Sequence, residues 1–87
     1  MWFAYILRCA DGALYVGATK DLSLRITKHN EGSAAQFTAG RRPVELVYSE
    51  AHATRDAAFA RERQIKGWTR VKKEALIAGD LGQLKRA

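Results

Sequence analysis

Residues 3–17 read FAYILRCADGALYVG, two apolar runs on either side of an Asp-Gly turn. Aromatic, Ile, Leu and Val side chains dominate both runs, and such side chains suit a pleated, half-buried surface. Two runs of this kind around a short Asp-Gly segment predict an antiparallel hairpin. A loop of residues 10–12 would place Gly12 at the left-handed position that a type I turn with a bulge requires. The sequence therefore predicts a hairpin with a three-residue loop.

The length of that loop decides which side chains share a face of the hairpin. With three loop residues, Leu7 lies opposite Tyr15, and Tyr5 lies opposite Gly17. Side chains alternate between the two faces of a strand, so Tyr5, Leu7, Cys9 and Tyr15 fall on one face. A two-residue turn would put the two tyrosines on opposite faces. The predicted register thus gathers two phenols on one surface, with a glycine opposite the first that leaves room above it.

Length and charge limit the classes of function. The chain has 87 residues, enough for one domain with a modest core. Its 15 Lys and Arg residues against nine Asp and Glu give a formal charge of +6, which favours polyanionic partners, nucleic acid first. A soluble basic domain without a nucleic-acid role is the alternative. No apolar run is long enough to span a bilayer, and a single cysteine excludes an internal disulfide, so we expect a cytoplasmic protein without a membrane partner.

The remaining pattern predicts four further elements, which gives the order β-β-α-β-α-α. They are a helix over residues 22–30, a strand over 44–48, and helices over 55–66 and 70–78, with a loop over 31–43 between the first helix and the strand. Cap residues bound the three helices: Asp21, Thr54 and Thr69 before them, and Gly32, Gly67 and Gly79 after them. We assign residues 1–79 to one domain and expect residues 80–87 to form a short tail that frays.

Three expectations concern packing outside the hairpin. The last helix has a weak apolar stripe of Val71, Ala75 and Ala78, helped by Leu76. Trp68 is expected to pack between the last two helices. His52 is expected on the surface, in the turn before the helix over residues 55–66.

Two residues of the first helix are candidates for binding or catalysis. Arg25 and His29 lie four residues apart, so they project from one stripe of that helix. The alternative is a solvated basic face. The position of the pair, directly after the two-tyrosine hairpin, favours a functional role.

Glu62 is the most informative single residue in the pattern. It falls inside the apolar stripe that Ala58, Phe59 and Ile65 form on the helix over residues 55–66. A carboxylate on an inward face is unfavourable unless it is paired or binds a metal. The alternative to a metal is an ion pair with a neighbouring cation, for which the candidates are Arg61, Arg63 and Lys66.

These residues together resemble the GIY-YIG nuclease domain, in particular its small single-domain bacterial members. The resemblance covers about residues 3–76 and rests on Tyr5, Tyr15-Val16-Gly17, Arg25, His29 and Glu62. The first signature is degenerate, since Phe3-Ala4-Tyr5 stands where the family has Gly-Ile-Tyr. The fold that the resemblance implies is an α/β (α+β) domain with a small three-stranded antiparallel sheet flanked by helices, in agreement with the predicted order.

The resemblance implies a divalent-metal-dependent endonuclease that hydrolyses phosphodiester bonds. In this chain Tyr5 would activate the attacking water, Tyr15 would orient the scissile phosphate, and Arg25 would stabilise its charge. His29 would assist proton transfer or orientation, and Glu62 would bind Mg²⁺ or Mn²⁺. A tyrosine needs a cationic neighbour to act as a base, and the sequence offers His29, Lys20 or Arg8. The expected nucleic-acid contacts are Lys20, Arg25, Arg41, Arg42 and Lys66.

Substrate and partner follow from the resemblance alone. The expected substrate is DNA, in branched, nicked or single-stranded form, in repair or recombination. Many family members carry a late asparagine in the site, and here the only asparagine is Asn30. Two alternatives therefore remain: a non-catalytic nucleic-acid-binding module, or a catalytic subunit that is inactive until a partner protein supplies specificity.

Overall fold

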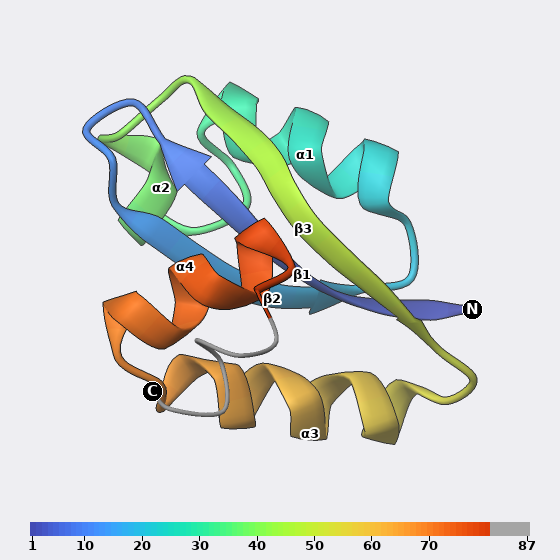
Figure 1. Cartoon of the computed structure of the whole chain (residues 1–87). Helices are drawn as coiled ribbons and strands as arrows, with labels where there is room; N and C mark the ends of the chain where they lie inside the picture. Colours follow the sequence, from blue (N-terminus) through green and yellow to red (C-terminus); the bar gives the residue numbers. More distant parts are fainter. Residues whose placement is uncertain (81–87) are drawn as a thin grey trace.

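A computed structural model describes residues 1–80 of the chain and shows a three-stranded antiparallel sheet with helices on both faces (Figure 1). The strand order is β2-β1-β3, so the first strand is central. The elements are β1 (Trp2–Cys9), β2 (Leu14–Thr19), α1 (Leu22–Glu31), α2 (Gln36–Ala39), β3 (Val44–His52), α3 (Arg55–Lys66) and α4 (Arg70–Ala78). Among residues 1–80, no helix is both long and apolar enough to cross a membrane. The predicted fold class is confirmed; the predicted tail lies outside the described residues except for Asp80.

The hairpin has the predicted loop and register. The amide of Cys9 donates to the carbonyl of Ala13 at 2.8 Å, and the amide of Gly12 donates to the carbonyl of Cys9 at 2.9 Å. Gly12 has a φ of 87°, a left-handed conformation that glycine adopts more readily than residues with a side chain. Tyr5 pairs with Gly17 and Leu7 with Tyr15. Both tyrosines therefore lie on one face, as the three-residue loop requires.

The alternation along β1 supplies two separate cores, one on each face of the sheet. Tyr5, Leu7 and Cys9 pack with Val44 on one face, where Leu22 and Ile26 of α1 cover them. Ile6 packs on the other face with Val16 and with Ile65 of α3. Trp68, between α3 and α4, packs against this second core, as predicted. Because β1 is buried on both faces, it fixes α1 and α3 relative to each other.

The three predicted helix caps are all present. The side chains of Asp21, Thr54 and Thr69 each accept a hydrogen bond from a backbone amide in the first turn of α1, α3 and α4. Gly32 and Gly79 end their helices in the left-handed conformation. The predicted bounds of these helices are confirmed, except that α1 extends one residue further, to Glu31.

Two predicted segments differ in the structure because tertiary contacts extend them. The loop predicted over residues 31–43 contains the four-residue helix α2, which the structure stabilises through side chains described below. The third strand runs on to His52 rather than ending at residue 48, because its residues pair with β1 as far as Trp2. A bulge in β3 faces Ile6 and Leu7, after which Tyr48, Glu50 and His52 point toward α3. The prediction of His52 in a surface turn was therefore wrong.

The apolar stripe predicted for α4 was also wrong in part. Val71 is 57% exposed and Ala78 is exposed, whereas Ala75 is buried. Leu76 and Ile77 pack against the second core instead. Nine residues with five apolar side chains fit more than one helical stripe, and the contact with the sheet selects among them.

A hydrogen-bonded cluster joins β3 to α3. Glu50 accepts hydrogen bonds from Tyr48 at 2.5 Å and from Nε of Arg61 at 3.0 Å, and it contacts His52 at 2.6 Å. Burial by itself would raise the pKa of the Glu50 carboxyl, but the hydrogen bonds from Tyr48, His52 and Arg61 outweigh it and hold the pKa below its usual value. Burial of the Tyr48 phenol and its hydrogen bond to Glu50 raise the pKa of Tyr48 to about 12. This cluster fixes α3, which carries Glu62, against the sheet.

Candidate active site

The phenol of Tyr5 lies at the centre of the site, on the central strand and beneath α1. Its side chain has no exposed surface. Gly17 lies directly across from it on β2, so close that a Cβ atom there would meet Cζ of Tyr5 at 2.5 Å and would also contact its hydroxyl oxygen. Glycine is therefore required opposite Tyr5, and the room that the sequence predicted above the first tyrosine is filled by the phenol itself.

A chain of hydrogen bonds runs through the Tyr5 hydroxyl. Its oxygen is 3.0 Å from Nε2 of His29 and accepts a hydrogen bond from Nε of Arg25 at 3.4 Å. On the far side of the imidazole, Nδ1 of His29 is 2.8 Å from the hydroxyl oxygen of Thr38. His29 and Thr38 are both fully buried. The structure thus brings together Tyr5, Arg25 and His29, as predicted, and adds Thr38.

Burial controls the protonation of this chain. It raises the pKa of Tyr5, and the hydrogen bond from Arg25 offsets only part of the rise. Burial, with a smaller contribution from the Arg25 charge, lowers the pKa of His29. At neutral pH the phenol therefore keeps its proton and the imidazole is uncharged. Of the three cations that the sequence offered as neighbours of Tyr5, His29 is neutral and Arg8 binds Glu74 at 2.7 Å. The third, Lys20, has no hydrogen bond to Tyr5 among the described residues, and the cation bonded to the Tyr5 oxygen is Arg25 instead.

Tyr15 lies beside the same imidazole and is half-buried. Its ring is 4.9 Å from the His29 ring and 6.4 Å from the Tyr5 ring, measured between centroids. On its other side, Phe37 of α2 approaches to 5.9 Å. The two tyrosines therefore share one surface with His29, and the partly exposed Tyr15 is the one that meets solvent.

Glu62 projects from α3, and its side chain is only 13% exposed. One carboxylate oxygen, Oε2, forms an ion pair with Nζ of Lys66 at 2.7 Å, the alternative that the sequence left open. Within residues 1–80, the other oxygen has no hydrogen-bond or ion-pair partner. The charge of Glu62 is near enough to Tyr5 to contribute to the raised pKa of that phenol.

The donor set fits a single hard cation with one protein ligand. The described residues contain no group of three or more His, Cys, Asp or Glu side chains that could hold a metal. Glu62 offers one unpartnered carboxylate oxygen, a ligand type that Mg²⁺ and Mn²⁺ prefer. Any such ion would complete its coordination with water and substrate oxygens.

Arg41 and Arg42, which were expected to contact phosphate, form hydrogen bonds with other residues of the protein. Nε of Arg41 donates to Asp11 at 3.0 Å and its Nη1 donates to the carbonyl of Phe37 at 2.8 Å. Nε of Arg42 donates to the carbonyl of Ala39 at 2.8 Å. Both side chains therefore hold α2, the segment that carries Thr38. Their predicted phosphate contacts remain a prediction, as do those of Lys20 and Lys66.

Two residues with a structural part in the site carried no signal in the sequence. The Asn30 side chain bonds the amide and the carbonyl of Val44, at 2.8 and 3.2 Å, and so joins the end of α1 to β3. Thr38 reaches His29 because α2 folds back over α1. Both contacts depend on the path of residues 31–43, which no periodicity in that segment reveals.

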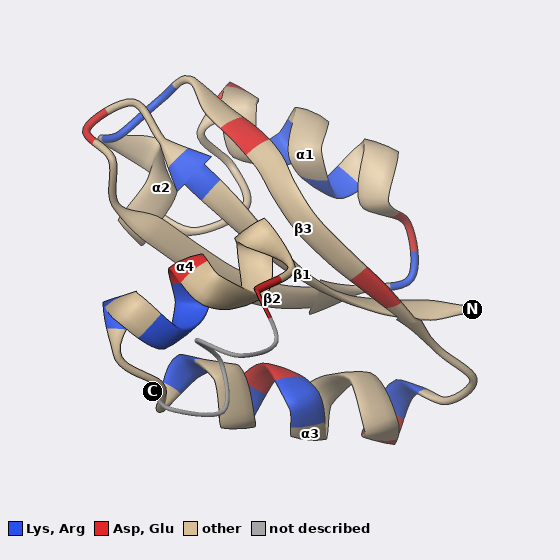
Figure 2. Ribbon diagram, in the orientation of Figure 1, with Lys and Arg blue, Asp and Glu red and all other residues tan. Residues whose placement is uncertain are grey.

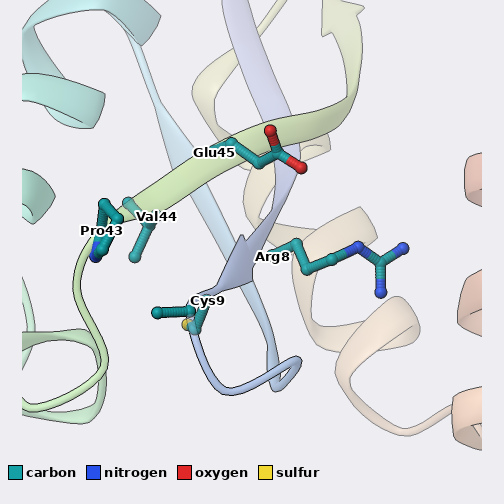
Figure 3. Close-up of a pocket in the computed structure, with 6 residues that line it drawn as sticks. Arg8, Cys9, Pro43, Val44 and Glu45 are labelled. Carbon is teal, nitrogen blue, oxygen red and sulfur yellow. The ribbon is translucent and has the colours of Figure 1, made fainter.

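Two other features of the described residues are the distribution of Lys and Arg and a cavity that lies apart from the cluster around Tyr5. Lys and Arg residues lie on α1, α3 and α4 and give the molecule basic surface on both sides of the sheet (Figure 2). A cavity of about 340 Å³ lies where β1 ends and β3 begins, lined by Arg8, Cys9, Ala10, Pro43, Val44 and Glu45 (Figure 3). None of the predicted catalytic residues lines it.

Comparison with known proteins relates the chain to one family. Residues 1–75 match the family model described as the GIY-YIG catalytic domain. A UPF0213 protein of Staphylococcus aureus strain Mu3 is 51% identical over 75 residues, which are 86% of this chain and 92% of that protein. The UPF0213 protein of strain COL matches to the same extent. The solution NMR structure of a UPF0213 protein from Bacillus halodurans is 38% identical and has a TM-score of 0.58, with 98% of this chain and 94% of that chain covered.

Proposed function

Because this chain belongs to the GIY-YIG catalytic domain family, we propose that it is a divalent-metal-dependent endonuclease acting on DNA. The family as a whole is one of nucleases, and the names of the matched relatives assign no more specific activity. The observation that carries the proposal is the buried chain from Arg25 through Tyr5 to His29. A module that only binds nucleic acid has no use for a phenol bonded to a neutral imidazole beneath a basic side chain.

The proposed step is the attack of water on a phosphodiester. As the water oxygen bonds to phosphorus, its proton passes to the Tyr5 oxygen, and the Tyr5 proton passes to Nε2 of His29. The bond from phosphorus to the leaving oxygen breaks, and that oxygen takes up a proton from solvent. The lowered pKa of His29 keeps the imidazole in the neutral form that can accept the proton, and it also makes that imidazole a weaker base than a solvated histidine.

Arg25 links the arrival of substrate to the exposure of Tyr5. The contact from Arg25 to the Tyr5 oxygen is long, at 3.4 Å, and the guanidinium is only partly buried. The two non-bridging oxygens of a phosphodiester share one negative charge. They can accept two charge-assisted hydrogen bonds from a guanidinium, which is a stronger interaction than a bond to a phenol. In the proposal the arriving phosphate draws Arg25 outward, which stabilises phosphate charge and leaves the Tyr5 oxygen open to water. Tyr15, which is half-buried beside it, orients the phosphate.

Glu62 would hold the metal, with Lys66 next to it. When bound, Mg²⁺ or Mn²⁺ would supply charge stabilisation for the phosphate and the leaving oxygen. The ion pair with Lys66 turns the carboxylate toward the end of α3 until the ion binds. The +6 charge of the chain favours DNA as the polyanion, with branched, nicked or single-stranded forms as the proposed substrates in repair or recombination, in the cytoplasm. The alternative of a catalytic subunit that needs a protein partner predicts that the isolated chain binds DNA without cutting it.

The test is cleavage of labelled single-stranded, duplex and branched DNA with Mg²⁺ or Mn²⁺. Wild type, Glu62→Gln, Tyr5→Phe and a matched control, Glu45→Gln, are purified identically, since Glu45 is an exposed carboxylate outside the site. We expect metal-dependent cutting by wild type and control, and a loss of about 100-fold or more in the other two. Equal cutting by all four would refute the assigned site. Salt-sensitive binding without cutting by wild type would favour the binding module or the partner-dependent subunit.

A further inference from the structure

Thr38 occupies an unusual position for a threonine of a short surface helix. Its side chain is fully buried, and its hydroxyl oxygen lies between two groups. It is 2.8 Å from Nδ1 of His29 and 3.1 Å from the carbonyl oxygen of Ala35, to which it donates. A hydroxyl has one proton to donate and can also accept. The question for the site is therefore which way the proton lies between Thr38 and His29.

Only one arrangement gives every proton of this buried chain an acceptor. If the Thr38 hydroxyl donates to Ala35, its oxygen accepts from Nδ1–H of His29. The neutral imidazole then has its lone pair on Nε2, which accepts the Tyr5 hydroxyl proton, while the Tyr5 oxygen accepts from Arg25. Each hydrogen bond runs in the same sense, from Arg25 and Tyr5 toward Ala35.

The opposite arrangement leaves a buried donor without a partner. If Thr38 donated to Nδ1, then Nε2–H would point at the Tyr5 oxygen, which already receives Nε–H of Arg25. The Tyr5 hydroxyl proton would then have no acceptor among the described residues, in a side chain with no exposed surface. A buried donor without a partner is destabilising, whereas the carbonyl of Ala35 keeps the amide of Ala39 as a donor in either case.

We propose that Thr38 is a positioning residue that fixes His29 as the Nδ1–H tautomer and so makes Tyr5 the donor to Nε2. Its consequence for catalysis rests on the proposed function: the proton acceptor for Tyr5 is already in place before substrate binds. The role parallels that of an orienting group behind a catalytic histidine, whose loss leaves the imidazole in the wrong tautomer. Arg41 and Arg42 contribute indirectly, since they hold α2 against the rest of the site.

The test reads the tautomer directly, by long-range ¹H–¹⁵N correlation of the histidine rings in the intact protein. Wild type and Thr38→Ser, which keeps the hydroxyl, should show His29 with its proton on Nδ1. Thr38→Val has nearly the same shape but no acceptor, so each tautomer there leaves one buried donor unpaired, and His29 should change from the Nδ1–H form alone to a mixture of the Nδ1–H and Nε2–H forms. His52 lies outside the site and serves as an internal control that should not change. A wild-type His29 protonated on Nε2, or a Thr38→Val spectrum identical to wild type, would overturn the proposal.

Cleavage assays of the same variants separate this proposal from the proposed function. For an active wild type, Thr38→Val should lower kcat about tenfold to a hundredfold with little change in KM, and Thr38→Ser should restore most of it. An inactive wild type that nevertheless has the Nδ1–H tautomer would refute the nuclease function and leave the tautomer assignment standing. If Thr38→Val fails to fold, the tautomer in wild type and in Thr38→Ser still decides.

Discussion

Replacing Gly17 by alanine should destabilise the protein, although backbone preference alone favours the opposite sign. Gly17 lies within β2, where glycine is less favourable than alanine by roughly 0.5–1 kcal/mol. Its φ is not positive, so no left-handed conformation is at stake. An added Cβ, however, would meet Cζ of Tyr5 at 2.5 Å and Cε2 at 3.0 Å. Any gain from the backbone must therefore be set against this overlap.

The Tyr5 ring cannot move aside without loss. It is fully buried between β2 and α1, and its hydroxyl is bonded to His29 and Arg25. Overpacking of a close-packed core typically destabilises by about 1–3 kcal/mol. The net change in the free energy of unfolding should be a loss of about 1–2 kcal/mol, once the backbone preference is subtracted. For a domain of this size each kcal/mol corresponds to a fall in Tm of about 4–8 °C.

Urea unfolding followed by circular dichroism measures the change. Gly40→Ala is the matched control, since nothing lies within 4 Å of a Cβ at that position and its φ is −89°. In a Tyr5→Leu background the overlap is gone, and Gly17→Ala should then be neutral or stabilising. A loss that is no larger than that of Gly40→Ala, or one that persists unchanged with Tyr5→Leu, would refute the reasoning.

Three further predictions concern single contacts. The pKa of Glu50 is lower in the folded protein than in the unfolded chain, where it is about 4.3. Glu50 therefore stabilises the fold above that pH, and this stabilisation is lost as the pH falls through the folded pKa. Glu50→Gln should make the free energy of unfolding fall less steeply over this acid range. Lys66→Gln removes the competitor for Glu62. Because Lys66 is itself half-exposed, this i,i+4 pair contributes about 0.3–0.5 kcal/mol, so Mn²⁺ should bind about twofold tighter by calorimetry, and weaker binding would contradict the assigned ligand. Asn30→Ala loses two hydrogen bonds to Val44 and should lower the free energy of unfolding by about 1–3 kcal/mol in urea, with Asn30→Asp, which keeps the acceptor, losing less.

Most of the fold could be predicted because the deciding interactions are local. The loop of residues 10–12 sets the register of the hairpin, and α1, α3 and α4 each begin where a side chain caps an amide three residues ahead. Such contacts join residues that are neighbours in the chain, so residue type and spacing suffice to identify them. The inward position of Glu62 followed in the same way from the period of its helix.

The segments that were predicted wrongly lack such local signals. The helix α2 is held by Arg41 and Arg42, and the end of β3 exists because β1 offers hydrogen-bond partners as far as Trp2. On α4, apolar side chains lie on more than one face of the helix. Only the contact with the sheet decides that Ile77 packs against the second core while Val71 is exposed. In each case several conformations satisfy the local pattern, and burial against a distant element selects one.

The sequence by itself predicted the hairpin register, the helices α1, α3 and α4, and the five residues that the family resemblance singles out: Tyr5, Tyr15, Arg25, His29 and Glu62. Only the tertiary structure decided their state. Burial keeps Tyr5 protonated and His29 neutral, Lys66 binds one oxygen of Glu62, and Thr38 completes the chain of hydrogen bonds. These properties depend on desolvation and on contacts across the fold, which residue order alone does not contain, because a pKa or a proton position is set by everything that surrounds the group.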